Sequence, residues 1–141
     1  MKKQVFSVRL DDPIDRVFFL FHYEKIRHVP VMDKSEVVGI VSDRDLYKTL
    51  GPKSQRRGVA TVEDETALYV IPKKVQHIMR RGVVTIDPDA TLSDAASMMA
   101  KRKIGALPVV TNGKLVGIIT ATDLLNSFAK LADDAEKRVG S

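Results

Sequence analysis

The sequence predicts a mixed α/β (α+β) protein made of two copies of one unit that pack as a pseudo-two-fold pair. The stretch Gly39–Asp45 is repeated at Gly117–Asp123, and each copy reads as a buried strand that ends in a hydroxyl residue and runs directly into a helix. The offset of 78 residues holds without a gap over residues 5–50 and 83–128. Two copies are too few for a solenoid, so each is expected to bury the apolar face of the other.

The first copy is expected to start with a short strand at residues 5–8, followed by a helix that opens at Asp12 and Pro13. Asp is a favourable cap, and Pro suits the first helical position. The helix has a wide apolar stripe, which predicts core packing. Its aromatic density leaves a second interpretation open, in which one of three phenylalanines also serves a dimer interface: Phe18, Phe19 or Phe21.

Two further strands are expected in the first copy, at residues 29–32 and 37–41, and then a helix from Asp43 to about Leu50 that stops at Gly51. The second copy repeats this order, with a strand at 83–86, a capping sequence at Thr91–Asp94, a hairpin turn at Asn112-Gly113 and a helix from Thr122 towards Ala132. The chain therefore divides into a first unit at residues 1–50, a linker at 51–74, a second unit at 75–132 and a frayed tail at 133–141.

Composition limits the possible functions. At 141 residues the chain can bury one good core, and its hydrophobic content of 44% is ordinary for a globular protein. There is no apolar run of about 18 residues, so no membrane-spanning helix is expected. The absence of cysteine is compatible with a reducing cytoplasm, where we expect the protein to be located. The net charge of +5 suits anionic ligands, but the basic residues are scattered and Trp is absent, so no nucleic-acid partner is indicated.

The sequence contains no recognisable catalytic motif. It lacks a Gly-x-Ser-x-Gly elbow, a Walker-type phosphate loop and a His-Glu-x-x-His metal site. The three histidines, His22, His28 and His77, do not have the spacing of metal ligands. We therefore expect no enzymatic activity, no metal site and no required cofactor.

The two strand-to-helix junctions are the candidate binding sites. Each has a hydroxyl at the N-cap and an acid three residues later, Ser42 with Asp45 and Thr120 with Asp123. An ionised carboxylate accepts hydrogen bonds from the vicinal hydroxyls of a ribose, and the free N–H groups of a helix N-terminus favour phosphate. The alternative interpretation is helix capping alone. The repetition of the arrangement favours binding.

A fixed spacing of strand, glycine, hydroxyl and acid recurs in both copies: Val29-Pro30-Val31 with Val38–Leu46, and Leu107-Pro108-Val109 with Val116–Leu124. This pattern resembles the cystathionine beta-synthase (CBS) domain, and two such domains in tandem resemble a Bateman module, here in a stand-alone protein. The resemblance implies a β-α-β-β-α order in each unit and a regulatory module that binds adenosine-containing ligands. It covers nearly the whole chain apart from the linker and the tail.

The resemblance also implies that each ligand cleft is completed by elements of the other unit. The cleft that holds Asp45 would take its apolar and backbone partners from Ile104, Gly105 and the segment Val75–Met79. The cleft that holds Asp123 would take them from Ile26, Arg27 and the N-terminus.

The two clefts differ in charge. The resemblance implies that basic residues at the positions of Arg27 and His28 reach phosphate, and Arg44 adds a planar fork of donors. Small residues stand at the matching positions of the second unit. We therefore expect a phosphorylated nucleotide at Asp45, bound more weakly as pH rises past the range in which His28 is protonated. The Asp123 cleft is expected to be empty or to take a less charged adenosyl ligand. The alternative for the basic pair is ordinary surface exposure.

Two functions from different classes are compatible with the sequence. The first is a sensor that binds AMP, ADP, ATP or another adenosyl compound, such as S-adenosylmethionine or NADH, and transmits its ligand state to an unidentified partner protein. The second is a ligand-free dimerisation or scaffold module. In both cases we expect a homodimer, because the resemblance implies that helical faces dock into flat, disc-like dimers.

Overall fold

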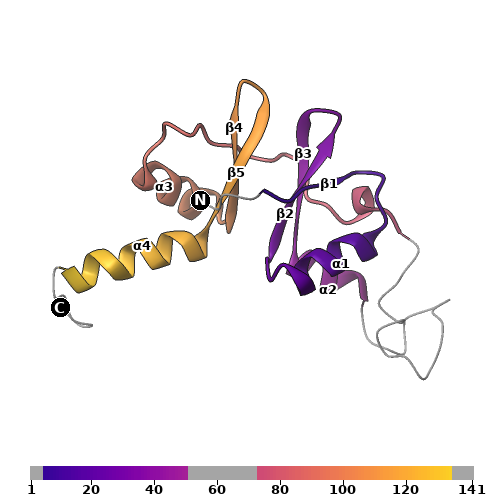
Figure 1. Ribbon diagram of the computed structural model, residues 1–141, viewed down its shortest axis with the longest axis horizontal. Coiled ribbons are helices and arrows are strands. Elements are labelled where there is room, and N and C mark those ends of the chain that lie inside the picture. The colour runs from indigo at the N-terminus through magenta and orange to yellow at the C-terminus, as the bar shows by residue number, and fades with distance from the viewer. Residues whose placement is uncertain (1–4, 51–72, 135–141) are drawn as a thin grey trace. The chain divides into compact units, whose positions relative to one another are not determined.

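The computed structural model describes residues 5–50 and 73–134, which fall into two compact units (Figure 1). Residues 6–50 and 73–83 belong to the first unit, and residues 84–134 with Val5 belong to the second. Residues 75–83, which the sequence analysis places in the second unit, therefore pack with the first. The predictions for the linker at 51–72, for residues 1–4 and for the tail from residue 135 lie outside the described residues.

The first unit contains a three-stranded sheet in the order β1-β2-β3. β1 (Val8–Arg9) pairs in parallel with β2 (His28–Asp33), which pairs antiparallel with β3 (Glu36–Ser42). α1 (Ile14–Tyr23) connects β1 to β2, and α2 (Asp43–Leu50) follows β3 without a break. α1 and α2 contact each other beside the β2–β3 hairpin (Figure 1). The order is β-α-β-β-α, as the resemblance implies.

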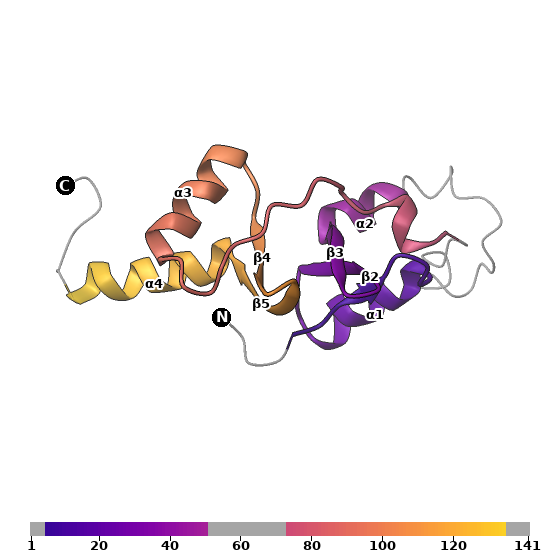
Figure 2. The same cartoon turned by 90° about the horizontal axis from the view of Figure 1, so that it is seen from above.

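The second unit repeats the helix, hairpin and helix. α3 (Leu92–Arg102) precedes the antiparallel pair β4 (Ala106–Thr111) and β5 (Lys114–Thr120), and α4 (Ala121–Asp134) follows directly. α4 contacts both α3 and β5 (Figure 2). The predicted mixed α/β class, with helices and strands in both units, is confirmed.

The sequence offset of 78 residues is preserved in the backbone pairing. His28 pairs with Ser42 at one end of the first hairpin, and Ala106 pairs with Thr120 at the same end of the second. Both hairpins shift register at the same place, after the fourth residue of β2 and of β4. Each unit therefore presents the same strand-to-helix junction.

The first strand of each unit is shorter than the sequence predicts. The strand expected at residues 5–8 is reduced to Val8–Arg9, and that expected at 83–86 is reduced to a single parallel bridge between Ile86 and Val109. In contrast, the Asn-Gly hairpin turn is confirmed, because both of its residues have positive φ angles of 51° and 77°.

Each unit has its own hydrophobic core. In the first, the buried residues come from α1, the three strands and the 3-10 helix η3 (Val75–His77) with the residues after it: Val8, Val17, Val29, Val31, Val41, Val75 and Met79. In the second, they are Ile86, Ala95, Met99, Leu107, Val109 and Ile119. Most positions match at the same offset, so the repeat in the sequence is largely a repeat of core positions.

The start of α1 differs from the prediction. Pro13 occupies the N-cap position, and no side chain caps the helix. The Asp12 carboxylate instead accepts the backbone N–H of Arg9 at 2.8 Å and lies 3.6 Å from Arg16 Nε. The prediction that Asp12 caps the helix is wrong, because its carboxylate accepts a hydrogen bond within the turn after β1 instead.

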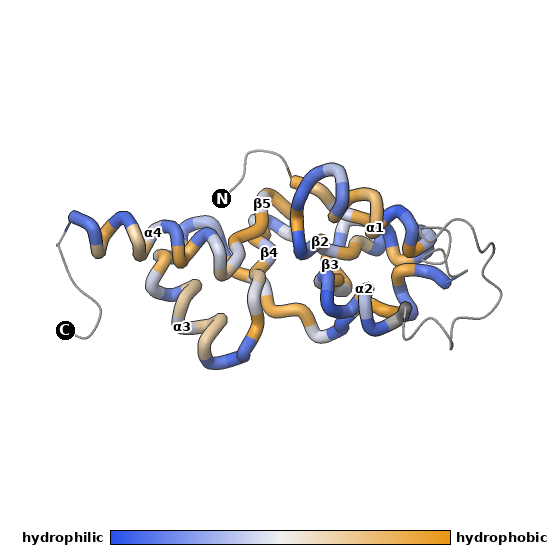
Figure 3. The backbone as a smooth tube through the Cα atoms, turned by 90° about the horizontal axis from the view of Figure 1, so that it is seen from below, coloured by the Kyte–Doolittle hydropathy of each residue, from blue (hydrophilic) through white to orange (hydrophobic). Residues whose placement is uncertain are grey.

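Two helices, α1 and α4, each leave more than one large apolar side chain exposed. On α4, hydrophobic and hydrophilic stretches alternate along the helix (Figure 3), and Leu125, Phe128 and Leu131 are each about two-thirds exposed. On α1, Phe19 and Tyr23 are 49% and 68% exposed. None of the helices that the structure describes is both long and apolar enough to cross a membrane.

Candidate functional site

The junction of β3 and α2 holds a buried carboxylate. Asp45 is 7% exposed, and its Oδ2 accepts the Ser42 backbone N–H at 2.9 Å and the Ser42 hydroxyl at 3.0 Å. The Asp45 N–H donates in return to the Ser42 hydroxyl oxygen at 3.3 Å. This reciprocal arrangement is a capping box with Asp as the acid. The hydrogen bonds offset much of the cost of burying the charge.

A further partner of Asp45 comes from a segment distant in the sequence. Arg80 Nε donates to Asp45 Oδ1 at 3.2 Å. The backbone of Arg80 is fixed beside β3 by two hydrogen bonds with Ile40, of 2.9 Å and 3.1 Å. The sequence analysis included the segment only as far as Met79 and therefore missed Arg80. The sequence signal that could have identified it is a basic residue directly after that segment.

Three basic residues that the sequence analysis names lie next to this junction along the backbone. His28 pairs with Ser42 across the hairpin, and the Arg27 carbonyl accepts the N–H of Asp43 at 3.0 Å. His28 is half-buried, whereas Arg27 is exposed. Arg44 is an exposed residue of the first turn of α2. The structure thus brings the predicted basic residues close to Asp45 along the backbone.

Burial lowers the pKa of His28 below its ordinary value of 6.5, because the charged imidazolium is poorly solvated there. The neighbouring Asp43 and Asp45 carboxylates oppose this shift, and Arg27 adds to it. His28 is therefore neutral near pH 7 in the protein without a ligand. The predicted loss of phosphate affinity as His28 loses its proton stays a prediction, and burial of the ring, which the sequence did not show, moves the expected loss to lower pH.

The second junction has the same backbone geometry with fewer polar partners. Asp123 Oδ2 accepts the Thr120 N–H at 2.9 Å, and the Asp123 N–H donates to Thr120 Oγ1 at 3.3 Å. Asp123 is half-buried, and no basic side chain of the described residues forms an ion pair with it. The expected difference in charge between the two junctions is therefore enlarged by Arg80.

The residues expected to complete each cleft lie in separate units. Ile26 precedes β2 in the first unit, whereas Ile104 and Gly105 precede β4 in the second, and all three are half-buried. Ile104 packs against the core of its own unit. The Gly105 carbonyl accepts the N–H of Ala121 at 2.9 Å, which repeats the contact made by Arg27. The completion of one unit's cleft by the other stays a prediction.

A third copy of the same capping box provides an internal comparison. Thr91 at the start of α3 accepts the Asp94 N–H at 3.0 Å and donates its own N–H to Asp94 Oδ2 at 3.1 Å. This confirms the predicted cap, and both residues are exposed. The box by itself therefore explains only capping. What sets Asp45 apart is burial together with its ion pair with Arg80.

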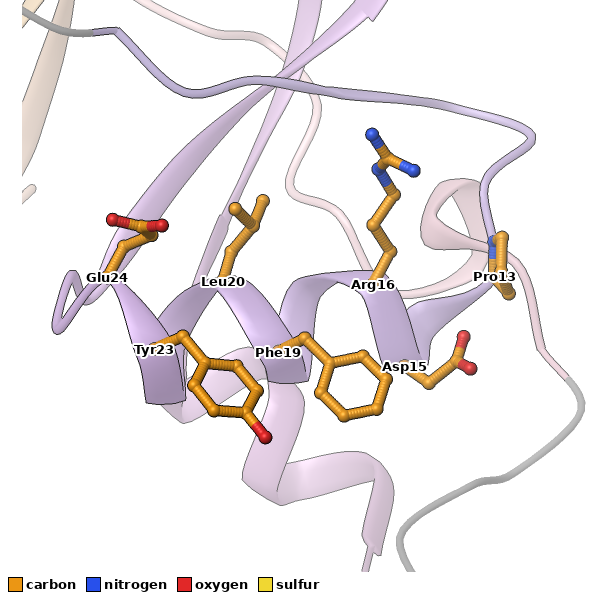
Figure 4. Close-up of a pocket in the computed structure, with 7 residues that line it drawn as sticks. All are labelled: Pro13, Asp15, Arg16, Phe19, Leu20, Tyr23 and Glu24. Atoms are coloured by element: carbon orange, nitrogen blue, oxygen red, sulfur yellow. The ribbon is translucent and has the colours of Figure 1, made fainter.

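Other parts of the described chain offer less to a ligand. No three His, Asp or Glu residues of the described ranges gather in a way that would hold a metal ion. An open groove of about 480 Å³ runs along α1 (Figure 4), and none of the predicted site residues lines it. Its wall is formed largely by exposed side chains of one helix, so the groove resembles a contact surface more than a ligand cavity.

A helix, a hairpin and a second helix recur in both units, with a hydroxyl and an acid after the last strand of each hairpin, and this defines a tandem pair of small α/β domains. The family model of the CBS domain matches residues 1–51 and 75–130. The chain belongs to the CBS domain family, and the predicted pair of CBS domains is confirmed.

Known relatives include proteins of similar length and parts of larger ones. The uncharacterised protein MJ1426 of Methanocaldococcus jannaschii is 33% identical, and the match covers 91% of this chain and 88% of that protein. Inosine-5'-monophosphate dehydrogenase of Korarchaeum cryptofilum is 29% identical over 99% of this chain but only 26% of the enzyme. The likeness to that enzyme is therefore confined to a minor part of it.

A solved structure is similar over nearly its whole length. The CBS domain pair of protein MJ0100, in complex with 5'-methylthioadenosine and S-adenosyl-L-methionine, superposes with a TM-score of 0.74 at 25% identity. The match covers 93% of both chains. A CBS pair of this fold thus binds adenosyl ligands.

Proposed function

We propose that the chain is a regulatory module that binds an adenosyl ligand at Ser42 and Asp45 and transmits its ligand state to a partner protein. The observation that carries this proposal is the buried Asp45 carboxylate, which has an arginine partner and lies beside Arg27 and His28. The adenosyl ligands of the MJ0100 pair support the class of ligand. AMP, ADP and ATP are the preferred candidates because the junction is rich in cations.

The roles of the side chains follow from their chemistry. An ionised Asp45 accepts hydrogen bonds from two ribose hydroxyls, while Ser42 holds the carboxylate in position. The exposed guanidinium groups of Arg27 and Arg44 are suited to phosphate oxygens. A neutral His28 supplies one donor and one acceptor, so it contributes hydrogen bonding rather than charge at neutral pH.

The second junction is assigned a weaker or different role. Thr120 and Asp123 offer the same acceptors for a ribose, but no cation of the described residues pairs with the carboxylate. We assign to this junction a less charged adenosyl compound, such as S-adenosylmethionine, or no ligand. NADH is a further candidate for the module because it also contains adenosine.

The proposal includes no chemical reaction. The family match and the similar solved pairs concern CBS domains, and the similar dehydrogenase is matched over about a quarter of its length. We therefore assign a regulatory role without catalysis or a required cofactor. A cytoplasmic location stays a prediction that rests on the absence of cysteine.

A ligand-free dimerisation module is the second candidate. It is favoured by one observation, namely that Ser42 and Arg80 already satisfy both oxygens of Asp45. In this reading the junction caps α2 and fixes the segment after η3, and no ligand is needed. Binding measurements separate the two candidates directly.

We also propose that two copies of the chain form a homodimer through helical faces. The support is the exposed apolar surface of two helices. Phe19 and Tyr23 stack with ring centroids 6.0 Å apart on one face of α1, where both rings point away from Leu20 (Figure 4). On α4, Leu125, Phe128 and Leu131 recur at intervals of three residues, which places them along one stripe.

A thermal-shift screen with AMP, ATP, NADH and S-adenosylmethionine tests the proposed function. A ligand present at about one hundred times its Kd stabilises the folded state by about 2.7 kcal/mol, which is readily detected. Thr91→Ala is the matched control for Ser42→Ala, because both remove the hydroxyl of a capping box. We expect both variants to lose stability, and only Ser42→Ala to lose part of the ligand-induced shift. No shift with any of the four compounds in the wild type would favour the ligand-free module.

A further inference from the structure

The backbone of Arg80 is held by hydrogen bonds, whereas its side chain is largely exposed to solvent. The two hydrogen bonds with Ile40 hold the Arg80 backbone beside β3. Its side chain is nevertheless 57% exposed, whereas its partner Asp45 is 7% exposed. The ion pair therefore joins a buried carboxylate to a cation at the surface.

The hydrogen bonds of Asp45 divide unevenly between its two oxygens. Ser42 donates twice to Oδ2, and both bonds belong to the capping box. Among the described residues, Arg80 is the donor to Oδ1. A pair of ribose hydroxyls that approaches this carboxylate must therefore compete with the Arg80 Nε–H for Oδ1. The guanidinium of Arg80 is largely exposed, so water can solvate it when it leaves, and the ribose hydroxyls then take its place as donors to Oδ1.

The guanidinium is well suited to the phosphate of the same ligand. Arginine carries five N–H donors in a planar fork, and only Nε is used toward Asp45. The fork fits two phosphate oxygens at once. A phosphate close to Asp45 would also be repelled by that carboxylate unless a cation stood between them. Arg80 is anchored where it can provide this cation.

We propose that Arg80 selects phosphorylated ligands at the Asp45 site by exchanging partners: it holds Asp45 Oδ1 in the free protein and turns to the ligand phosphate on binding. This inference rests on the proposed function, because it assumes that an adenosyl ligand binds at Asp45. Arg80 acts against ligands that lack phosphate, since they must displace it from Oδ1 and give it no new partner. It acts in favour of ligands that carry phosphate.

The exchange predicts opposite effects on two ligands. In Arg80→Gln, adenosine should bind as tightly as in the wild type or up to about fivefold more tightly, because the competing donor is weaker. AMP should bind about ten- to hundredfold more weakly, because a charge-assisted phosphate contact is lost. The quantity to measure is the ratio of the two Kd values, by calorimetric titration at constant salt.

Arg81→Gln is the matched control. Arg81 is the next residue in the chain and is exposed, its replacement removes the same charge, and among the described residues it forms no ion pair with Asp45. We expect this variant to keep the wild-type ratio of AMP to adenosine affinity. Arg80→Lys is the second variant, which retains the charge without the fork, and we expect it to keep part of the preference for AMP. The far-ultraviolet circular dichroism spectrum of each variant verifies that it is folded.

The outcomes separate this inference from the proposed function. If the wild type binds AMP and Arg80→Gln keeps the wild-type ratio, the inference is overturned while the proposed function stands. The same holds if Arg81→Gln changes the ratio as much as Arg80→Gln, because the effect would then be one of net charge. If the wild type binds neither adenosine nor AMP, the inference fails, and the proposed function fails as well if no compound of the thermal-shift screen binds.

Discussion

Asp45 is a buried carboxylate held by three donors, the N–H and hydroxyl of Ser42 and the Nε of Arg80. Such a group is costly to bury without partners, and removing it is also costly, because buried donors are then left without an acceptor. Its counterpart Asp123 is half-buried, and its capping box includes only Thr120. Replacement of Asp45 is therefore expected to lower the free energy of unfolding more than replacement of Asp123.

Burial of His28 makes the free energy of unfolding depend on pH. Its pKa in the folded state lies below 6.5 because the ring is partly buried, so protonation favours the unfolded chain. The contribution of His28 to stability is complete above pH 6.5 and is lost as pH falls through the folded-state pKa. Between about pH 7.5 and about pH 5, the free energy of unfolding should fall less steeply in His28→Gln than in the wild type.

Urea unfolding at a series of pH values measures this difference, and a nuclear magnetic resonance titration of the His28 ring measures the pKa itself. Identical pH profiles for the two proteins, or a ring that titrates at or above its ordinary value, would show that burial does not control this histidine.

At the scale of elements, the contact between β3 and the segment that ends at Arg80 depends on a glycine. A methyl group added at Gly39 would lie 2.5 Å from Met79 Sδ and 3.1 Å from the Arg80 carbonyl oxygen. The side chain of Met79 can move, but the backbone of Arg80 cannot move without breaking its pairing with Ile40. The glycine thus permits the close approach that positions Arg80.

Gly39→Ala should lower the free energy of unfolding by about 1–3 kcal/mol, as is usual when a packed contact is overfilled. Part of this cost arises from Met79, so the same change should cost less in a Met79→Ala background. A double-mutant cycle from denaturant unfolding measures the coupling between the two positions. Additive effects would indicate that the two residues do not touch.

The elements could largely be predicted from the sequence because their signals are local. The Asn112-Gly113 turn requires positive φ angles, which these residues adopt readily. The sequence repeat predicts the strand that comes directly before α2 and the one directly before α4. Arg80 could not be found in this way. Its link to Asp45 spans 35 residues and depends on the pairing of two segments, which no local pattern encodes. The role of Asp12 was also misassigned, because its carboxylate can either cap α1 or accept a hydrogen bond in the turn after β1, and the sequence does not show which it does.

At the scale of the whole molecule, the exposed stripe on α4 predicts self-association. Phe128 is 65% exposed in a single chain, which is unfavourable for so large an apolar side chain. Multi-angle light scattering should give about twice the chain mass of 15.7 kDa. Phe128→Glu should shift the protein toward the monomer, whereas Asn126→Glu, which adds the same charge at another exposed position of α4, should not.

A wild-type mass equal to one chain at micromolar concentration would contradict the dimer. A dimer that Phe128→Glu leaves intact would place the interface elsewhere, with the α1 face around Phe19 and Tyr23 as the next candidate.

The central claim is that AMP or a related adenine nucleotide binds at the Asp45 carboxylate, and calorimetric titration of AMP into the wild type, Asp45→Asn and Asp123→Asn tests it most directly. Each variant removes one negative charge and leaves a side chain of similar size. Loss of a charge-assisted contact is worth about 1.5–3 kcal/mol, so Asp45→Asn should weaken AMP binding about ten- to hundredfold. Asp123→Asn should leave the Kd for AMP nearly unchanged. An equal or larger loss in Asp123→Asn, or the absence of AMP binding to the wild type, would contradict the claim.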